Sequence, residues 1–175
     1  MIRLVYETHS TTVDNEAGNA TGWLPGELSA VGREQARELG ERRHDVDAVF
    51  SSDLGRALET VMIAFGVSDL PVLHDWRLRE VDYGVLNGAP ASELERGKHV
   101  DVPYPGGESY RDVVGRVASL LDDLRRGWTG NSVLVVSHAA PRWALQHLIE
   151  GVRLEELVEA PFDWQPGWEF RIETP

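Results

Sequence analysis

The 175-residue sequence contains no cysteine, which excludes disulfide bonds, thiolate catalysis and cysteine–zinc sites. It also has no apolar run near the roughly 20 residues that a membrane-spanning helix needs. Basic residues are few: 17 Lys and Arg stand against 29 Asp and Glu, and the formal net charge is -12. Because binding to nucleic acid or to an anionic membrane relies on a basic patch, we expect neither as a partner. The negative net charge does not exclude a small anionic substrate, because a local cluster of cationic side chains is enough to bind one.

Signals for export, internal repetition and domain separation are also missing. The first residues, MIRLV, predict a strand, since they lack the basic start, long apolar middle and cleavage site of a signal peptide. We therefore expect a cytoplasmic protein. No repeat or Pro/Gly/Ser-rich linker divides the chain, whose length suits one core better than two. The sequence thus predicts a single domain over residues 1–175 and leaves the oligomeric state open.

Strand-like and helix-like segments alternate along the chain. Strands are predicted over residues 2–8, 46–51, 70–73, 132–136 and 167–172, and helices over residues 28–43, 53–65, 108–126 and 140–149. The helix over 108–126 is the clearest, because its apolar residues recur on one stripe. Such alternation predicts an α/β fold, a three-layer α/β/α sandwich with a mainly parallel sheet. Residues 83–105, rich in Gly and Pro, are expected to be irregular and could form a lid or wall over a site.

Two helices carry local signals at their ends. Ser29 is the expected N-cap of the helix over 28–43, whose predicted buried face holds Val31 and other apolar residues. Ser52 or Asp53 is the expected cap of the next helix, which we predict to end at Gly66.

Three segments far apart in the sequence hold residues suited to a phosphoryl group. They are Thr8-His9-Ser10, SSDLGRA at residues 51–57, and Val136-Ser137-His138. Each histidine follows a predicted strand, and open α/β folds bind ligands at the carboxyl ends of their strands. We therefore expect two imidazoles and the Arg56 guanidinium to converge at one edge of the sheet.

Five motifs in order make this chain similar to the histidine phosphatase superfamily, the group that includes the cofactor-dependent phosphoglycerate mutases. The resemblance covers nearly the whole chain. It is carried by GWLPGELSAVGREQA at 22–36, SSDLGRALET at 51–60, RLREVDYGVLNG at 77–88, PGGES at 105–109 and VVSHAAPR at 135–142. It implies the phosphoglycerate mutase-like fold.

The first motif departs from the family's Arg-His-Gly. Asn15 follows His9 by six residues, as an asparagine follows the family's nucleophile, and this register places Thr8 at the arginine position and Ser10 at the glycine position. A register starting from Leu4-Val5 would instead leave no nucleophile. The preferred register requires the first strand to extend about two residues beyond those that its apolar pattern suggests.

The resemblance implies a phosphomonoester hydrolase that acts on a small phosphorylated substrate without a cofactor or metal. His9 would attack phosphorus and form a phosphohistidine. Arg56, a protonated His138 and Asn15 would hold the phosphoryl oxygens, because such a transition state is stabilised mainly by surrounding cations. Glu80 would protonate the leaving group, with Glu7 and Asp82 as nearby acidic alternatives.

Thr8 is the difficulty in this assignment, because a hydroxyl cannot replace the bidentate fork of a guanidinium. The loss of one comparable donor costs on the order of 3 kcal/mol. Arg79 is the predicted substitute, ahead of Arg77 and Arg142. Two alternatives therefore stay open: an impaired family member that serves as a phosphate-ligand-binding or protein-interaction module, and a phosphoglycerate-type mutase.

The remaining predictions concern the pocket and the other aromatic and histidine residues. Thr8, Ser10, Trp23 and Ala139 are predicted to line the pocket, and Trp76 could do so. Trp143 is expected in the core, whereas Trp164 and Trp168 could stabilise the last strand or form a partner surface. The other histidines, at 44, 74, 99 and 147, have no metal-like spacing and are expected to be structural or surface residues.

Overall fold

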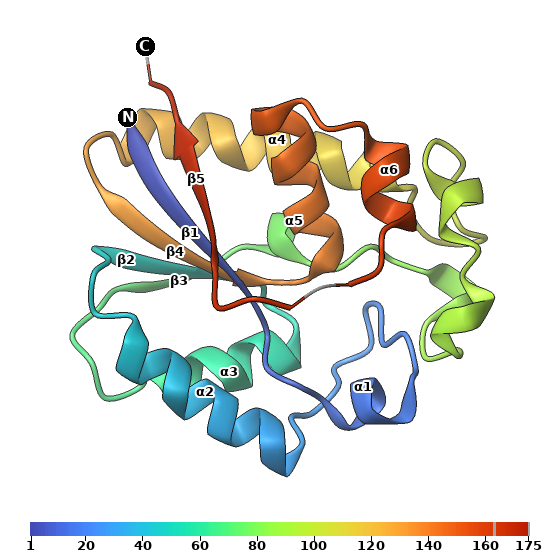
Figure 1. The fold of residues 1–175 in the computed structure, drawn as a ribbon, viewed down its shortest axis with the longest axis horizontal. Coiled ribbons are helices and arrows are strands. Elements are labelled where there is room, and N and C mark those ends of the chain that lie inside the picture. Colours follow the sequence, from blue (N-terminus) through green and yellow to red (C-terminus); the bar gives the residue numbers. More distant parts are fainter. Residues whose placement is uncertain (163, 175) are drawn as a thin grey trace.

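The computed structural model describes residues 1–162 and 164–174, which form a five-stranded mixed sheet covered by helices (Figure 1). The strands lie in the order β3-β2-β4-β1-β5. Their bounds are Ile2–Thr8 for β1, Ala48–Ser51 for β2, Val72–His74 for β3, Ser132–Ser137 for β4 and Trp168–Ile172 for β5. The first four are parallel, and β5 pairs antiparallel with β1 at one edge. The predicted α/β class with a mainly parallel sheet is confirmed.

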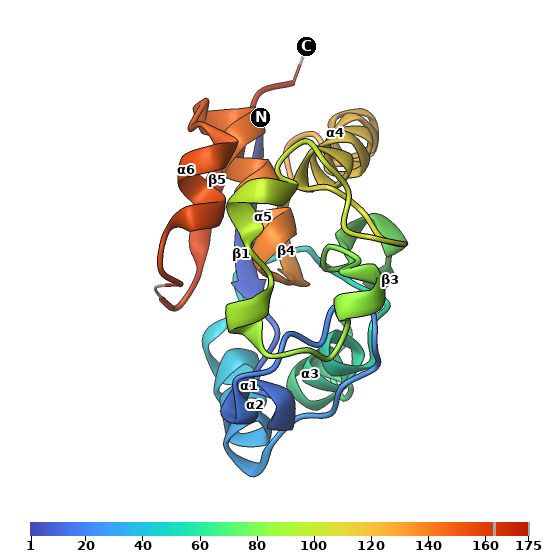
Figure 2. The same cartoon turned by 90° about the vertical axis from the view of Figure 1, so that its right-hand side faces the viewer.

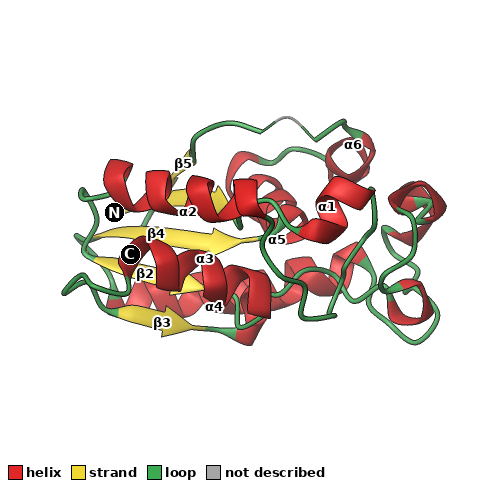
Figure 3. Cartoon of the chain, turned by 90° about the horizontal axis from the view of Figure 1, so that it is seen from below, coloured by secondary structure: helices red, strands yellow, loops and turns green. Residues whose placement is uncertain are grey.

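Helices cover both faces of this sheet, which gives the predicted three layers. In Figure 1, α2 (Ala30–Arg42) and α3 (Gly55–Phe65) lie below the sheet, and α4 (Tyr110–Gly127) and α5 (Ala139–Leu145) lie above it. Figure 3 looks onto the face that α2 and α3 cover. Successive strand residues point to opposite faces. Val5 of β1 therefore packs with the α2–α3 layer, while Leu4 and Tyr6 belong to the larger core on the other face.

The strongest helix prediction is confirmed in α4. Its apolar stripe is buried, and Ser109 and Asp112 form a reciprocal capping box at its start. The first strand also extends through Thr8, as the preferred register of the first motif requires. A short helix that the sequence did not predict, α1 (Val13–Ala17), begins with a second capping box, formed by Thr12 and Asn15.

Several local expectations were wrong. The N-cap of α3 is Leu54, which makes no side-chain capping bond. Neither predicted residue caps the helix, because Ser52 Oγ accepts the Leu54 N–H, which lies before the first turn, and the Asp53 carboxylate is bound by Arg79. Val31 is 56% exposed, because it lies on the solvent side of α2. β2 and β3 each begin two residues later than expected.

The C-terminal part of the fold also differs in detail. The helix expected over 140–149 is divided into α5 and a π-helical turn, Gln146–Glu150, and a further helix, α6 (Leu154–Glu159), precedes β5. Residues 83–105 form short 3₁₀ turns joined by loops, and Figure 2 shows this segment in front of the strand ends. None of the helices described is both long and apolar enough to cross a bilayer.

Candidate active site

The carboxyl ends of β1 and β4 bring the two predicted histidines together. These strands pair in parallel with Thr8 opposite Ser137, and the His9 N–H donates to the Ser137 carbonyl at 2.8 Å. The rings of His9 and His138 consequently lie 5.0 Å apart between centroids. Both rings are close enough for one tetrahedral anion to lie against them. The predicted convergence therefore occurs.

His9 is held with one ring nitrogen protonated and the other unprotonated. Its Nδ1 lies 2.8 Å from the Ser10 carbonyl oxygen, which can only accept, so Nδ1 carries the proton. Its Nε2 accepts from the Arg56 Nε–H at 3.2 Å and therefore holds a lone pair. Burial, and secondarily the charge of Arg56, lower the pKa of His9 from 6.5 to about 3. The imidazole is thus neutral at physiological pH.

Arg56 is oriented by the loop that precedes α2. Its Nη1 and Nη2 donate to the carbonyls of Leu24 at 3.0 Å and Gly22 at 2.8 Å, and the side chain is buried. Burial lowers its pKa, but a guanidinium stays charged at neutral pH. No carboxylate pairs with it within residues 1–162 and 164–174, and each terminal nitrogen retains one N–H that an anion could accept from.

His138 lies deeper than His9 and has no exposed surface. Its Nε2 is 2.9 Å from Ser52 Oγ, and its Nδ1 has no partner within the described residues. Burial lowers the pKa of His138 well below 6.5, and the nearby Arg56 and His9 lower it further. These effects favour the neutral imidazole, so the expected protonated form of His138 needs a negative charge beside the ring.

Tyr6 fixes the position of His138 and was missed by the sequence analysis. Its hydroxyl donates to the His138 carbonyl at 2.6 Å and accepts the His138 N–H at 3.1 Å. Burial raises the pKa of Tyr6, so the hydroxyl keeps its proton. A tyrosine inside an apolar strand needs such partners for its hydroxyl, and this was the available signal.

Glu80 lies at the start of α5 and faces the same cavity as His9. Its Oε1 accepts the N–H groups of Val81 at 2.9 Å and Ala140 at 3.1 Å, and its Oε2 accepts that of Ala139 at 3.2 Å. These three donors hold the carboxylate in one orientation. Oε2 has the single partner, so it is the oxygen with more room to exchange a proton with a ligand.

The acidic alternatives to Glu80 are engaged elsewhere. Glu7 is buried on the other face of β1 and pairs with Arg42 and Arg43, each at 3.1 Å. Asp82 accepts the Gly84 N–H at 2.9 Å through Oδ1, and the same oxygen accepts from a neighbouring asparagine amide. Neither carboxylate lines the cavities that contain His9 and Glu80.

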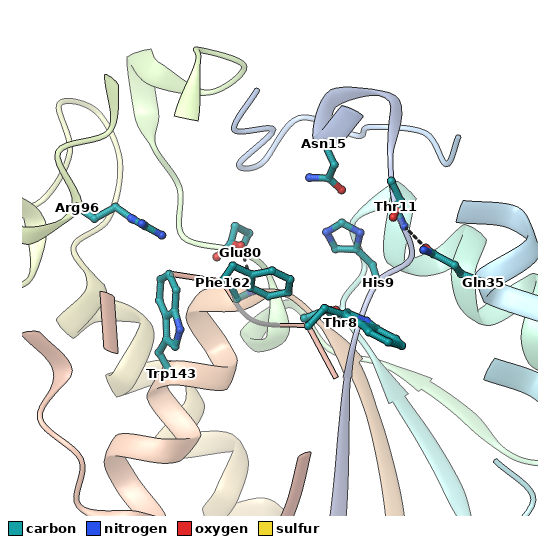
Figure 4. A pocket seen from close by; sticks show the side chains of 11 residues that line it. Thr8, His9, Thr11, Asn15, Gln35, Glu80, Arg96, Trp143 and Phe162 are labelled. Atoms are coloured by element: carbon teal, nitrogen blue, oxygen red, sulfur yellow. Dashed lines mark hydrogen bonds between the residues drawn. The ribbon is translucent and has the colours of Figure 1, made fainter. Parts of the chain in front are cut away.

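The main cavity has a volume of about 570 Å³ and is divided between a polar and an aromatic side. Figure 4 shows His9 and Asn15 on one side and Arg96 and Trp143 on the other. The complete lining is Thr8, His9, Thr11, Asn15, Gln35, Glu80, Arg96, Ala139, Trp143, Phe162 and Trp164. An adjoining cavity of about 220 Å³ adds Arg56 and Tyr83 and shares His9, Asn15, Glu80 and Arg96.

Asn15 and Ala139 lie in the cavity as expected, whereas two other predicted lining residues do not. The Asn15 Oδ1 caps α1 by accepting the Thr12 N–H at 3.0 Å, which leaves its amide N–H groups available. Ser10 lies behind His9, in a smaller cavity of about 230 Å³. Trp23 lines neither cavity at His9, because its indole N–H donates to the Glu80 carbonyl at 2.7 Å and supports that loop.

The arginines proposed to replace the missing guanidinium are held away from His9. Arg79 makes two bonds of 2.7 Å to the Asp53 carboxylate and does not line the cavities, so its assignment to the phosphate is corrected. Arg77 pairs with the carboxylates of Asp75 and Asp123. The Arg142 guanidinium lies against aromatic rings near β5.

Arg96 is the cavity arginine that the sequence analysis missed. It lies in a 3₁₀ turn (Arg96–His99) within the segment expected to form a wall, and it lines both cavities. Its guanidinium lies 5.6 Å from the centre of the Trp143 ring and has no carboxylate partner in the described part of the chain. No local pattern distinguishes it from a surface arginine, because only the long-range path of the loop places it there.

A histidine with an unprotonated nitrogen, beside a buried arginine and a second histidine at the carboxyl ends of parallel strands, suits the binding and transfer of a phosphoryl group. The chain belongs to the histidine phosphatase superfamily, whose branch 1 matches residues 8–164. It is 29% identical to phosphoserine phosphatase 1 of Hydrogenobacter thermophilus, over 89% of this chain and 80% of that protein.

Other relatives and structures agree with this assignment. A 2,3-bisphosphoglycerate-dependent phosphoglycerate mutase of Methylobacterium is 34% identical over 88% of this chain and 83% of its own. The structure of Bacillus stearothermophilus YhfR matches with a TM-score of 0.84 and 26% identity, over 95% of this chain and 88% of that one. A mycobacterial glucosyl-3-phosphoglycerate phosphatase, solved with VO3, matches with a TM-score of 0.78 and 29% identity, over 89% and 85%.

Proposed function

We propose that this protein hydrolyses phosphomonoesters through a phosphohistidine on His9. The observation that carries the proposal is the neutral His9 ring, whose Nε2 lone pair faces Arg56 in a cavity open to ligands. Nε2 attacks phosphorus, the bond to the leaving oxygen breaks, and protonated Glu80 gives that oxygen its proton. A water oxygen then attacks the phosphorus while Glu80 takes a proton from that water, the bond between phosphorus and His9 Nε2 breaks, and inorganic phosphate leaves.

The charge on the phosphoryl group is balanced by side chains of this chain. Arg56 has two free N–H donors, Asn15 has amide donors, and His138 takes up a proton when a dianion approaches. Arg96 supplies the second guanidinium in place of Arg79, because it lines the cavity and lacks a competing carboxylate in the described residues. This scheme uses arginine and imidazole charges and requires no metal.

We propose hydrolysis as the main reaction and keep the mutase reaction as the alternative, because both activities occur among the named relatives. The matched proteins include a phosphoserine phosphatase and a glucosyl-3-phosphoglycerate phosphatase as well as the mutases. We propose a small phosphorylated substrate, a single catalytic domain and a cytoplasmic location. The binding-module alternative stays open because of Thr8, which cannot supply the guanidinium expected at that position.

The proposal is tested by phosphoenzyme trapping and by turnover of an aryl phosphate. The wild type should incorporate labelled phosphate in an acid-labile, alkali-stable form, and His9→Ala should abolish both label and turnover. His44→Ala is the matched control, since His44 is exposed and does not line the cavities at His9 and Glu80. Equal, low turnover by wild type and His9→Ala would instead favour the binding module. Transfer of the label to phosphoglycerate rather than to water would favour the mutase.

A further inference from the structure

Three aromatic side chains line the main cavity, and together they are called the aromatic wall below. Trp143 comes from α5, and Phe162 and Trp164 come from the segment between α6 and β5. Trp143 is almost fully buried, whereas Phe162 and Trp164 are 49% and 54% exposed. Figure 4 shows Trp143 and Phe162 at this cavity. Two large apolar rings thus keep half of their surface open beside the nucleophile.

The contacts of these rings differ. Trp143 packs edge-on against Tyr110 at 5.7 Å and lies under the Arg96 guanidinium. Phe162 has the Arg142 guanidinium at 5.9 Å. Trp164 has no ring or cation partner within the described residues, although it lines two cavities. An indole without a stacking partner inside a cavity offers a free face to a ligand.

Thr8 connects this aromatic wall to the nucleophile. It lines the main cavity and the smaller cavity behind His9, and Trp164 lines both of them too. A threonine is much shorter than the arginine of the family motif, so the space between His9 and Trp164 stays open. Organic-ligand sites are commonly apolar cavities of about 300–1,000 Å³ with a few polar groups that orient the ligand. The cavity of about 570 Å³ fits that description and is much larger than one phosphate requires.

We propose that the alcohol part of the substrate carries a planar aromatic ring, which stacks on Trp164 and Phe162 while its phosphate lies at His9. This inference rests on the proposed function for the position of the phosphate. The ring replaces water on two half-exposed aromatic surfaces, and stacked aromatic pairs gain interaction energy beyond burial alone. The Arg96 guanidinium lies over the Trp143 ring at the same cavity.

The test compares esters that differ in the ring and not in the reactivity of the leaving group. For 2-phenylethyl phosphate and ethyl phosphate the wild type should show kcat/KM values that differ by about tenfold or more, in favour of the ring. 2-Cyclohexylethyl phosphate, which is apolar but not planar, should fall between them. Trp164→Ala should reduce the ring preference by about tenfold, and Trp164→Phe should retain most of it.

Trp76→Ala is the matched control, because Trp76 is 53% exposed and does not line the main cavity. It should leave the preference unchanged. Equal effects of Trp76→Ala and Trp164→Ala, or no preference for the ring in the wild type, would overturn the inference. Calorimetric binding of 2-phenylethylphosphonate and ethylphosphonate gives the same comparison without turnover. A ring preference in binding by a protein that does not hydrolyse the esters would support the aromatic site and reject the proposed function.

Discussion

The most informative perturbation restores the guanidinium that the first motif lacks. In Thr8→Arg the new side chain projects from the end of β1 into a cavity that His9, Asn15 and Glu80 line. One well-placed transition-state donor contributes about 3 kcal/mol. Since each 1.4 kcal/mol corresponds to about a factor of ten in rate, kcat/KM for a small ester such as p-nitrophenyl phosphate should rise by roughly a hundredfold.

The same substitution should have an opposite effect on larger substrates. The arginine would fill the space between His9 and Trp164, so the preference for 2-phenylethyl over ethyl phosphate should fall. Steady-state kinetics on both esters measure the two effects together. Thr11→Arg is the control, because Thr11 lines the same cavity and the variant adds the same charge. An unchanged rate in Thr8→Arg, or an equal gain in Thr11→Arg, would refute the reasoning.

Three further predictions follow from the same site. Arg96→Ala should weaken orthovanadate binding by about tenfold or more, whereas Arg79→Ala, which breaks a partly exposed pair, should change it little; calorimetry on both variants checks this. The folded-state pKa of His9, about 3, lies below its unfolded value of 6.5, so the unfolded chain binds more protons between these values and stability should fall as pH falls through that window. Urea unfolding from pH 7 to pH 4 should show this loss, at up to roughly 1.4 kcal/mol per pH unit for the histidine, and His9→Asn should reduce the slope. Tyr6→Phe should cost about 1–3 kcal/mol of unfolding free energy, since it removes the hydroxyl that bonds to both backbone groups of His138, and retention of full stability and activity would contradict that role.

The sequence correctly predicted the positions of those site residues that directly follow a strand. His9 and His138 follow apolar runs whose parallel pairing was expected, and parallel strands place their carboxyl ends at one edge. Arg56 was predictable because it follows β2 within a recognisable motif. In each case a regular element determines where the side chain points.

The wrong or missed predictions concern residues in irregular segments, where no helix or strand determines the direction of the side chain. Arg79 stands next to Glu80 in the sequence, but its guanidinium is bound by the Asp53 carboxylate and not directed to the cavity of His9. Arg96 and Trp164 come from irregular segments, and their positions depend on how distant parts of the chain pack. Val31 shows a related limit, because a single apolar residue in a mostly polar helix does not identify its buried face.

The antiparallel pairing of β5 with β1 fixes the end of the chain segment that carries the cavity aromatics, apart from the strands that position the histidines. The fixed register of these strands holds the connection that carries Phe162 and Trp164 at the cavity of His9, yet neither side chain bonds to His9, Arg56 or His138 in the described structure. Changes in this connection can therefore alter which alcohol is accepted while the phosphoryl cage is preserved. Substitutions in the connection before β5 should therefore change substrate preference more than they change the rate of phosphoryl transfer.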